Sequence, residues 1–434
     1  MLVGACLLLL LSSPELVQSK SDVEVERIAE AWQAPLEANT TTLVYVQVAW
    51  RHGDRTPAAP VPFSDADSWS EGLGELTKKG MAQQYRLGKW LRSRYGKFLG
   101  DHFDRHEVFV RSSDYNRTLM SAQANMAGLY PPSKSEMWET GLAWQPVPVH
   151  SYPKSIDKEL YEDIPCPTAS AEFRKVWKSD VVSKMELENK DLILFLREHS
   201  QIPNFQFYML WMIYDNLFCM LQHNDTHVWP PWMNSSLFSR VQKLYDASSR
   251  MKYHTEVLRR LRGGPLLKDV VDRFVAKRDG VLGDRPKLYA YSAHDTTLAA
   301  MLSTLGIYPA EFPRYATAVL LELHDRDGEL IVEVYHKNMT DVDSVYRYLI
   351  PGCTDPCTLD ALRSTVEKYL PNDWTAECGL AGPDALNYMI STAVFACTTV
   401  LLAGFIALDV TLKRRHRSSF ASDPLMVDDD EASI

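Results

Sequence analysis

Residues 51–57 (RHGDRTP) place a histidine between two arginines, with a glycine and a proline in the same short run. Guanidinium groups are planar, carry a positive charge at any working pH, and match the oxygens of a phosphate group. The charges of Arg51 and Arg55 disfavour protonation of His52, because a like charge lowers the pKa of an imidazole. A neutral His52 beside a bound phosphate can attack phosphorus as a nucleophile. The pattern therefore indicates phosphoryl chemistry rather than a solvated patch of surface charge.

A predicted strand positions these side chains. Residues 42–50 (TLVYVQVAW) are almost entirely apolar or β-branched, which is typical of a buried strand. The strand ends where the polar run begins, and Gly53 and Pro57 indicate a rigid turn directly after it. Ligands of open α/β sheets bind at the carboxyl edge of the strands, which is where we expect this turn.

Arg111 lies at a second predicted strand end. A short strand is expected over residues 107–111, and a helix over residues 114–130 follows it at once. The amino terminus of a helix favours an anion through its dipole and its free amides. An isolated arginine here would be an ordinary turn residue, so its role depends on the other motifs of the chain.

His294 and Asp295 follow a third predicted strand, residues 287–293 (KLYAYSA), and precede a helix expected over residues 296–305. A carboxylic acid can protonate a departing alkoxide if its neighbours keep it protonated at acidic pH. The simpler interpretation is that Asp295 caps the amino terminus of the helix, and the two roles are compatible.

Four segments together resemble the motifs of the histidine acid phosphatases, in the animal membrane-anchored branch that includes lysosomal, prostatic and testicular enzymes. They are residues 51–57, 108–114 (VFVRSSD), 117–122 (RTLMSA) and 291–297 (YSAHDTT). They occur in the order and at the spacing of that family, and the likeness extends over roughly residues 42–380. The combination is far more specific than any one of the segments.

The resemblance implies hydrolysis of phosphate monoesters through a phosphohistidine at His52, with Asp295 as the proton donor. It implies phosphate contacts from four further side chains: Arg51, Arg55, Arg111 and His294. It implies no cofactor and no metal, because these side chains supply the positive charge. Small phosphomonoesters are the expected substrates, phosphoproteins are further candidates, and the family pattern implies a homodimer.

Two other functions are consistent with parts of the chain. A membrane-anchored interaction protein could bind phosphate without turning it over, but every catalytic position of the family is filled by the expected residue type. A phosphoglycerate-mutase-like transferase shares the arginine and histidine chemistry, but it fits poorly with secretion and a membrane anchor.

The expected fold is a phosphoglycerate-mutase-like α/β sandwich with an inserted, mainly helical smaller domain and one C-terminal transmembrane helix. At 434 residues the chain is long enough for two domains. Residues 42–150 and 265–380 carry the strand patterns and form the predicted catalytic domain. Residues 151–264 lose the strand signal and show helical periodicity with aromatic clusters, which indicates the insertion.

Inside the α/β part, apolar spacing predicts a helix over residues 75–99 with basic side chains on its outer face. Residues 315–323 and 329–335 resemble a closing hairpin, with the turn at residues 325–328 (DRDG). Residues 20–41 form an acidic lead-in with no evident role.

Both ends of the chain carry targeting signals. Residues 1–19 have the length and apolar centre of a signal peptide, although the first residues contain no Lys or Arg. Residues 389–408 are uncharged over twenty positions, which suffices to span a bilayer as a helix. The basic run at residues 413–417 (KRRHR) then predicts that the tail, residues 409–434, is cytosolic. The expected protein is single-pass and type I, with its catalytic part in the lysosome or at the cell surface.

Five sequons lie on the side that this topology makes luminal or extracellular, at Asn39, Asn116, Asn224, Asn234 and Asn338. Their joint placement is consistent with a glycoprotein. The net charge of −10 speaks against a nucleic-acid partner and suits an anionic body with a local basic pocket.

The cysteines of the secreted part indicate disulfides, because an oxidising compartment favours them over a thiolate metal site. The resemblance pairs Cys353 with Cys357, and Cys166 with Cys378. Ala318 stands where related enzymes commonly carry a further cysteine, which leaves the remaining thiol, at position 219, unpaired. That thiol is either buried and free, which is favoured, or an intermolecular link.

Two histidine pairs, 102 with 106 and 223 with 227, have a spacing of four residues that can bind metal on a helix. Neither pair contains the glutamate of a zinc-protease HExxH motif, and the second pair brackets a sequon. We therefore predict no metal site at either pair.

Overall fold

The computed structural model describes residues 31–308, 311–338, 344–380 and 383–420. The predicted signal peptide, residues 1–19, lies outside the described residues, and so does the end of the predicted tail from residue 421.

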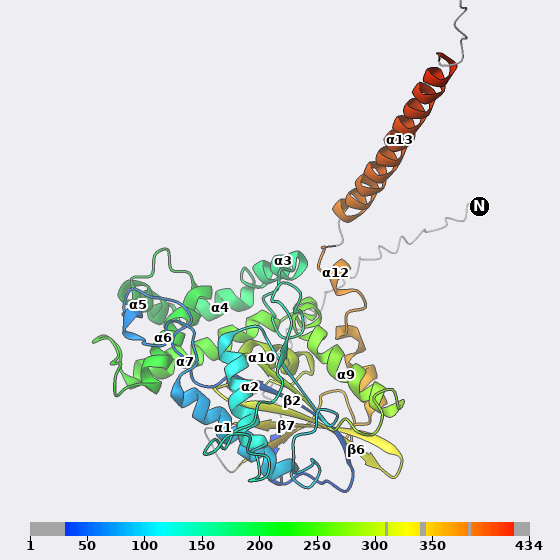
Figure 1. The fold of residues 1–434 in the computed structure, drawn as a ribbon. Coiled ribbons are helices and arrows are strands. Elements are labelled where there is room, and N and C mark those ends of the chain that lie inside the picture. Colours follow the sequence, from blue (N-terminus) through cyan, green and yellow to red (C-terminus); the bar gives the residue numbers. More distant parts are fainter. Residues whose placement is uncertain (1–30, 309–310, 339–343, 381–382, 421–434) are drawn as a thin grey trace, which may run out of the picture.

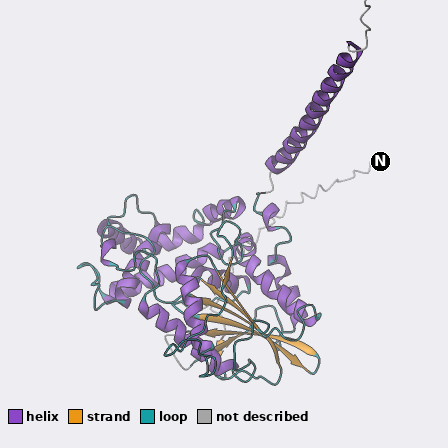
Figure 2. Cartoon of the chain, in the orientation of Figure 1, coloured by secondary structure: helices purple, strands orange, loops and turns teal. Residues whose placement is uncertain are grey.

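An eight-stranded mixed sheet forms the centre of the molecule, in the order β1-β8-β7-β6-β2-β5-β3-β4 (Figure 2). Strands β2, β5, β3 and β4 pair in parallel, whereas β2, β6, β7, β8 and β1 pair antiparallel. The strands are β1 (Ala31–Gln33), β2 (Leu43–Arg51), β3 (Val108–Ser112), β4 (His150–Ser151), β5 (Leu288–Ala293), β6 (Ala318–Arg326), β7 (Glu329–Lys337) and β8 (Tyr346–Tyr348). The predicted α/β fold class is therefore confirmed.

Helices cover both faces of this sheet (Figure 1). Alternate residues of β2 enter different cores, with Val48 in one cluster and Ala49 in the other. The first cluster packs against α1 (Lys78–Tyr95) and α2 (Asn116–Leu129). The second packs against α9 (Gly264–Arg278), α10 (Asp295–Thr304) and α11 (Leu359–Val366).

Most of the remaining helices lie between β4 and β5 in the chain. They are α3 (Pro167–Val176), α4 (Asp180–Glu188), α5 (Lys190–Ser200), α6 (Leu210–Gln222), α7 (Ser235–Ser249) and α8 (Glu256–Leu258). Short helical turns are η1 (Ala66–Ser68), η2 (Phe207–Met209), η3 (Arg250–Tyr253), η4 (Arg259–Gly263), η5 (Glu367–Tyr369) and the four-residue α12 (Trp374–Glu377). Helices α3 to α7 share a hydrophobic core of their own, and α4 to α7 lie to one side of the sheet in Figure 1.

The observed elements differ from the predicted ones mainly at their ends. The helix expected over residues 75–99 begins only at Lys78, because the side chain of Thr77 caps it by accepting from the amide of Gly80. The first strand of the closing hairpin begins at Ala318 instead of residue 315. Strand β1 was not predicted, because three residues carry no usable periodicity and their partner β8 is more than 300 positions away.

The cysteines pair as the resemblance implied. Cys166 and Cys378 form one disulfide over a sequence separation of 212, and Cys353 and Cys357 form another over a separation of 4. Cys219 is a buried free thiol in this chain.

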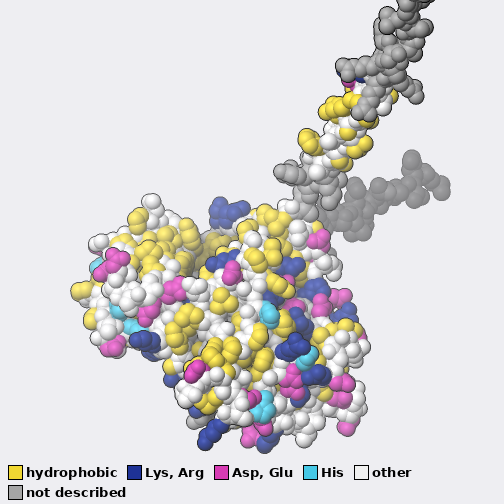
Figure 3. Space-filling view, viewed as in Figure 1, with side chains coloured by type: hydrophobic (Ala, Val, Ile, Leu, Met, Phe, Trp, Pro, Cys, Tyr) yellow, Lys and Arg dark blue, Asp and Glu magenta, His cyan; other side chains and the backbone are white. Residues whose placement is uncertain are grey.

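Helix α13 (Pro383–Phe420) extends away from the rest of the structure. Within the described residues, Ile390–Lys413 of α13 is the one helical segment that is long and apolar enough to cross a membrane. Its mean hydropathy is 2.1, and none of its apolar stretch is buried against the rest of the structure. Hydrophobic side chains cover this segment in Figure 3, as expected for a surface that meets lipid. This span contains the predicted run 389–408 except for its first residue.

Candidate active site

The RHGDRTP segment leaves the sheet beside the segment that carries His294 and Asp295. Strands β2 and β5 are parallel neighbours, and Arg51 at the end of β2 lies opposite Ala293 at the end of β5. The amide of His52 donates to the carbonyl of Ala293 at 2.9 Å. Both polar segments therefore emerge at the carboxyl edge of the sheet, as the strand patterns predicted.

His52 is fully buried and its ring has a defined orientation. Its Nδ1 lies 2.8 Å from the carbonyl oxygen of Gly53, which can only accept, so Nδ1 carries the proton and Nε2 keeps its lone pair. The pKa of His52 lies well below its usual value, first because of burial and then because of the charges of Arg117, Arg51 and Arg55. A neutral imidazole with an available lone pair is the form that acts as a nucleophile.

Gly53 is required by close packing. A Cβ atom at this position would lie 2.3 Å from the carbonyl oxygen of Gly80 in α1, so only glycine allows the two backbones to approach. The amide of Gly53 also donates to the hydroxyl of Ser121 in α2 at 3.1 Å. The loop that carries His52 is therefore held against both helices of that face.

Five arginines line the cavity that His52 faces, and the three whose charges act on His52 differ in their partners. Arg51 pairs with Asp295 at 2.9 Å, and Arg55 makes two contacts with Asp215 at 3.1 and 2.8 Å. Arg117, in the first turn of α2, forms no ion pair with a carboxylate of the described residues. Burial and the charge of Arg55 lower its pKa to about 10. The cavity thus contains a cation that is not neutralised by the protein.

Arg111 lies elsewhere, which differs from the expectation that it shares the site with His52. Its guanidinium pairs with Asp157 at 2.5 Å and Glu159 at 3.0 Å, and it stacks 4.3 Å from the ring centre of Tyr152. Side chains alternate along β3, so Val110 faces the core beside α1 and α2 while Arg111 points to the opposite side.

Arg117 was missed in the sequence, although it opens the RTLMSA segment that carried part of the resemblance. The available signal was its position in the first turn of the helix after β3, where the chain has turned back toward the sheet edge.

His294 and Asp295 begin helix α10. His294 is its N-cap residue and Asp295 its first helical residue, so the carboxylate is not the cap that the alternative interpretation expected. The Nε2 atom of His294 lies 2.9 Å from the hydroxyl of Ser113, and Arg117 donates to its Nδ1 at 3.5 Å. Both ring nitrogens therefore have protein partners.

Asp295 is ionised in this arrangement. Burial raises its pKa, but the charges of Arg51 and Arg55, with smaller contributions from His294 and the amide of Thr296, together outweigh burial, so the pKa lies below its usual value. Its Oδ1 also accepts from the amide of Thr296 at 2.8 Å. A proton donor at this position must therefore obtain its proton when the substrate binds.

The cavity has a volume of about 400 Å³ and reaches from the sheet edge to the helical block. Its charged end contains His52, Arg51, Arg55, Arg117, His294 and Asp295. Its remaining walls combine aromatic rings, among them Tyr208, Trp211, Tyr214, Phe218, Tyr245 and Phe312, with the charged side chains of Glu162, Asp163, Asp215, Lys252, Arg262 and Arg314. A ligand whose anionic group lies beside His52 and whose body offers both a ring surface and polar groups fits this lining.

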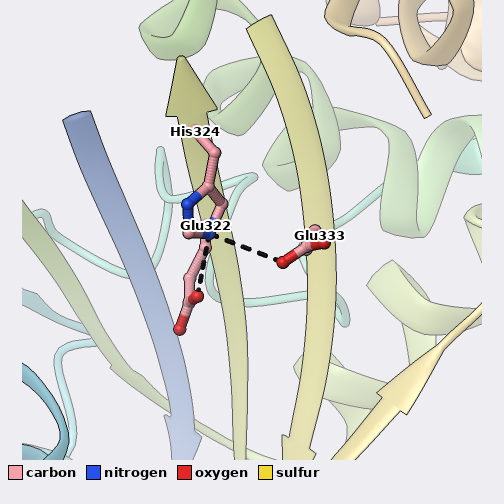
Figure 4. Close-up of side chains that lie close together, drawn as sticks. All are labelled: Glu322, His324 and Glu333. Carbon is pink, nitrogen blue, oxygen red and sulfur yellow. Dashed lines mark hydrogen bonds and ion pairs between the residues drawn. The ribbon is translucent and has the colours of Figure 1, made fainter. Parts of the chain in front are cut away.

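A second group of titratable side chains, Glu322, His324 and Glu333, lies close together on β6 and β7 (Figure 4). His324 pairs in register with Leu43 at the start of β2, so this group lies at the opposite end of the sheet from His52. The carboxylates already have partners, because Arg94 pairs with Glu322 at 2.8 Å and Arg326 with Glu333 at 2.7 Å. The group is a buried ion-pair network, in which the two arginines balance the charges of the two carboxylates.

The predicted glycosylation sites lie at the surface with one exception. Asn39, Asn116, Asn224 and Asn234 are exposed, and Asn338 is partly buried. The amide of Asn116 donates to Glu75 at 3.2 Å, and Asn234 caps α7.

A family model described as "Histidine phosphatase superfamily (branch 2)" matches residues 42–337. The chain belongs to this superfamily. The prediction of a histidine phosphatase is thereby confirmed as to family and enzyme class, and the alternative of a binding protein without turnover is not favoured.

Relatives at the sequence level cover most of this phosphatase. A Caenorhabditis elegans protein assigned as acid phosphatase 5 is 50% identical over 85% of this chain and 86% of the relative. The lysosomal acid phosphatase of Bos taurus is 34% identical over 86% of this chain and 88% of the relative. The prostatic acid phosphatase of Homo sapiens is 36% identical over 77% of this chain and 88% of the relative.

Solved structures show the same fold as this phosphatase. The phytase of Hafnia alvei in complex with tartrate matches with a TM-score of 0.62 at 16% identity, over 78% of this chain and 98% of that one. The phytase of Citrobacter braakii matches with a TM-score of 0.61 at 15% identity, over 78% of this chain and 99% of that one.

Proposed function

We propose that this phosphatase hydrolyses phosphate monoesters at acidic pH in two steps. In the first step Nε2 of His52 attacks phosphorus, the bond from phosphorus to the ester oxygen breaks, and Asp295 protonates the departing alcohol. In the second step water attacks the phosphohistidine, Asp295 accepts a proton from that water, and phosphate leaves. The observation that carries this proposal is the buried His52, kept neutral by burial and by three arginines in one cavity.

Arg51, Arg55, Arg117 and His294 are the proposed phosphate contacts. Arg117 takes the place that the resemblance suggested for Arg111, because it lines the cavity and pairs with no carboxylate of the described residues. Three guanidiniums offset the charge that grows on the phosphoryl oxygens in the transition state. His294, which Arg117 contacts, completes this wall once phosphate is bound.

The ion pair of Asp295 with Arg51 supports a substrate-linked route for the proton. A phosphate monoester loses its second proton near pH 6, so the monoanion carries a proton into the site under acidic conditions. Phosphate oxygens then compete for Arg51, and the pKa of Asp295 rises as its cationic partner is shared. Asp295 is thereby protonated at the stage when the alcohol must leave.

Replacing the nucleophile tests the proposal directly. The variant His52→Ala is expected to lose at least ~10³-fold in kcat and to keep its thermal unfolding midpoint within a few degrees. Quenching with alkaline denaturant during turnover of a labelled substrate is expected to trap phosphate on His52 in the wild-type protein, because the phosphorus–nitrogen bond survives alkali and hydrolyses in acid. Turnover by His52→Ala, or label on another residue, would refute the assignment. Activity is expected to survive a strong chelator, because side chains supply the positive charge.

We also propose that the protein is a type I membrane protein, with a signal peptide at residues 1–19 and its catalytic part in the lysosome or outside the cell. The apolar segment Ile390–Lys413 and the lysosomal relatives support this placement. Glycosylation at the five sequons and a homodimer belong to the same proposal. Protease protection of the tail in sealed vesicles, with glycosidase treatment, tests topology and glycosylation together.

The proposed domain division assigns residues 42–150 and 265–380 to a catalytic domain and residues 151–264 to an inserted helical domain. The separate hydrophobic core of helices α3 to α7 supports it. Hydrogen exchange of residues 151–264 is expected to show a protection level of its own, distinct from that of the strands of the sheet.

A further inference from the structure

Helix α6 contacts the RHGDRTP loop at two points, eight residues apart on the helix. In its middle, Asp215 accepts from the guanidinium of Arg55 at 3.1 and 2.8 Å and from the amide of Ala58 at 2.8 Å. At its end, Nε2 of His223 lies 2.6 Å from Oδ1 of Asp54. The helix therefore contacts the two residues, Asp54 and Arg55, that directly follow His52 and Gly53.

We propose that His223 is a positioning residue for the nucleophile, acting through Asp54, and that Asp215 is the positioning residue for Arg55. The inference rests on the proposed role of His52. It assigns different parts of the reaction to the two contacts of one helix, because one holds the attacking ring and the other holds a phosphate-binding cation.

The path from His223 to His52 is short, and it is buried from Asp54 onward while His223 itself is partly exposed. Oδ1 of Asp54, a residue with no exposed surface, also accepts from the hydroxyl of Thr77 at 2.5 Å. The amide of Asp54 belongs to the peptide group whose carbonyl, on Gly53, accepts from Nδ1 of His52. A shift of Asp54 therefore rotates the carbonyl that fixes the ring orientation of His52.

His223 is itself held in place from both sides. It is the C-cap of α6, and its amide donates to the carbonyls of Cys219 and Met220. Trp69 packs against the edge of its ring with 5.4 Å between ring centres, and the same Trp69 stacks on His227 at 3.7 Å. The four-residue spacing of these two histidines thus places His223 against Asp54 and His227 against Trp69.

The two contacts predict separable kinetic effects. Loss of the His223 contact misorients the nucleophile, which lowers kcat and leaves phosphate binding unchanged. Loss of the Asp215 contact releases Arg55, which binds phosphate in the ground state as well as the transition state, and this raises KM and the inhibition constant of phosphate.

The experiment compares His223→Gln with His223→Asn. The amide nitrogen of glutamine reaches the position of Nε2 and can still donate to Asp54, whereas that of asparagine stops near the position of Nδ1. Both substitutions are polar and similar in size, so their effects on folding are matched. His227→Asn is the control, because His227 also contacts Trp69 but makes none of the recorded contacts to the RHGDRTP loop.

We expect His223→Asn to lower kcat on the order of tenfold with an unchanged inhibition constant for inorganic phosphate. His223→Gln and His227→Asn are expected to stay within about threefold of the wild type in kcat. Asp215→Asn is expected to raise the inhibition constant for phosphate on the order of tenfold. Thermal unfolding of each variant verifies that it is folded.

The inference is overturned if His223→Asn and His223→Gln have the same kcat. It is also overturned if His223→Asn weakens phosphate binding by the same factor by which it lowers kcat. A failure of the proposed function has a different signature, because the wild type would then show no phosphohistidine after the alkaline quench. A wild type that forms it, together with an unaffected His223→Asn, refutes only the role of His223.

Discussion

Arg51 and Asp295 form an ion pair of 2.9 Å where β2 ends and α10 begins. The same arginine donates to the carbonyl of Pro313 at 2.7 Å, so its guanidinium is fixed before any ligand arrives. In the proposed mechanism, one cation therefore serves both the phosphate and the residue that protonates the leaving group. This arrangement links the protonation of Asp295 to occupancy of the phosphate site.

Asp295→Asn is expected to affect substrates according to their leaving groups. An alkyl phosphate needs a proton on its departing oxygen, so its kcat should fall by about 10³-fold, whereas the kcat for p-nitrophenyl phosphate should fall by about tenfold. Steady-state kinetics with both substrates measure the two losses. Equal losses would show that Asp295 acts as a charge and not as a proton donor.

Arg117→Met and Arg111→Met form a matched pair, because each keeps the side-chain stem and removes the charge. Arg117→Met is expected to weaken phosphate inhibition roughly 10–100-fold, through loss of charge-assisted hydrogen bonds. Arg111→Met should leave phosphate inhibition unchanged and lower the free energy of unfolding by about 3 kcal/mol, because Asp157 loses its buried partner.

Inhibition constants for phosphate and urea unfolding curves separate the two effects. If Arg111→Met weakened phosphate binding and Arg117→Met did not, the original assignment of Arg111 would be correct.

His336 is expected to make the folded protein less stable as the pH falls. Burial, and then the charge of Lys337, lower its folded pKa to about 4, whereas an unfolded chain protonates histidine near pH 6.5. Between these values the unfolded chain binds a proton that the folded chain does not, so the free energy of unfolding falls as pH drops from about 6.5 to 4.

His336→Asn keeps an acceptor for the hydroxyl of Tyr348, which lies 3.1 Å from Nδ1, and removes the titration. Urea unfolding at pH 7, 5.5 and 4.5 should give a shallower pH dependence for this variant than for the wild type. Identical slopes in the two proteins would contradict the prediction.

The two disulfides should contribute unequally to stability. In the chain-entropy account, a loop of 212 residues gives about 5 kcal/mol and a loop of 4 gives about 2 kcal/mol. Cys166→Ser should therefore lower the free energy of unfolding more than Cys357→Ser does. Denaturant unfolding under non-reducing conditions measures both, and an equal cost would argue against the entropic account.

The strands that position the site were predictable, because buried strands have a strong local signal. The apolar run before Arg51 and the run before His294 each end at a polar segment, and parallel neighbours bring both ends together. The side on which a strand residue points was harder to assign. Arg111 and Arg117 are only six positions apart, yet strand alternation turns one away and the first turn of α2 turns the other inward.

Contacts from distant parts of the chain could not be read from local patterns. Asp215 and His223 lie in a helix whose sequence shows only apolar periodicity, and nothing nearby indicates that it meets Arg55 and Asp54. The ionised state of Asp295 has the same origin, because it depends on Arg51, which lies in a different strand.

Strand β1 (Ala31–Gln33) gives the first described residues a protective role. It is the outermost strand on its side of the sheet, and it pairs with β8 through Trp32 and Arg347. A shortened chain that begins after Gln33 would leave the backbone amides and carbonyls of β8 open to another molecule. Such a truncation would self-associate through strand addition, even with its catalytic residues intact.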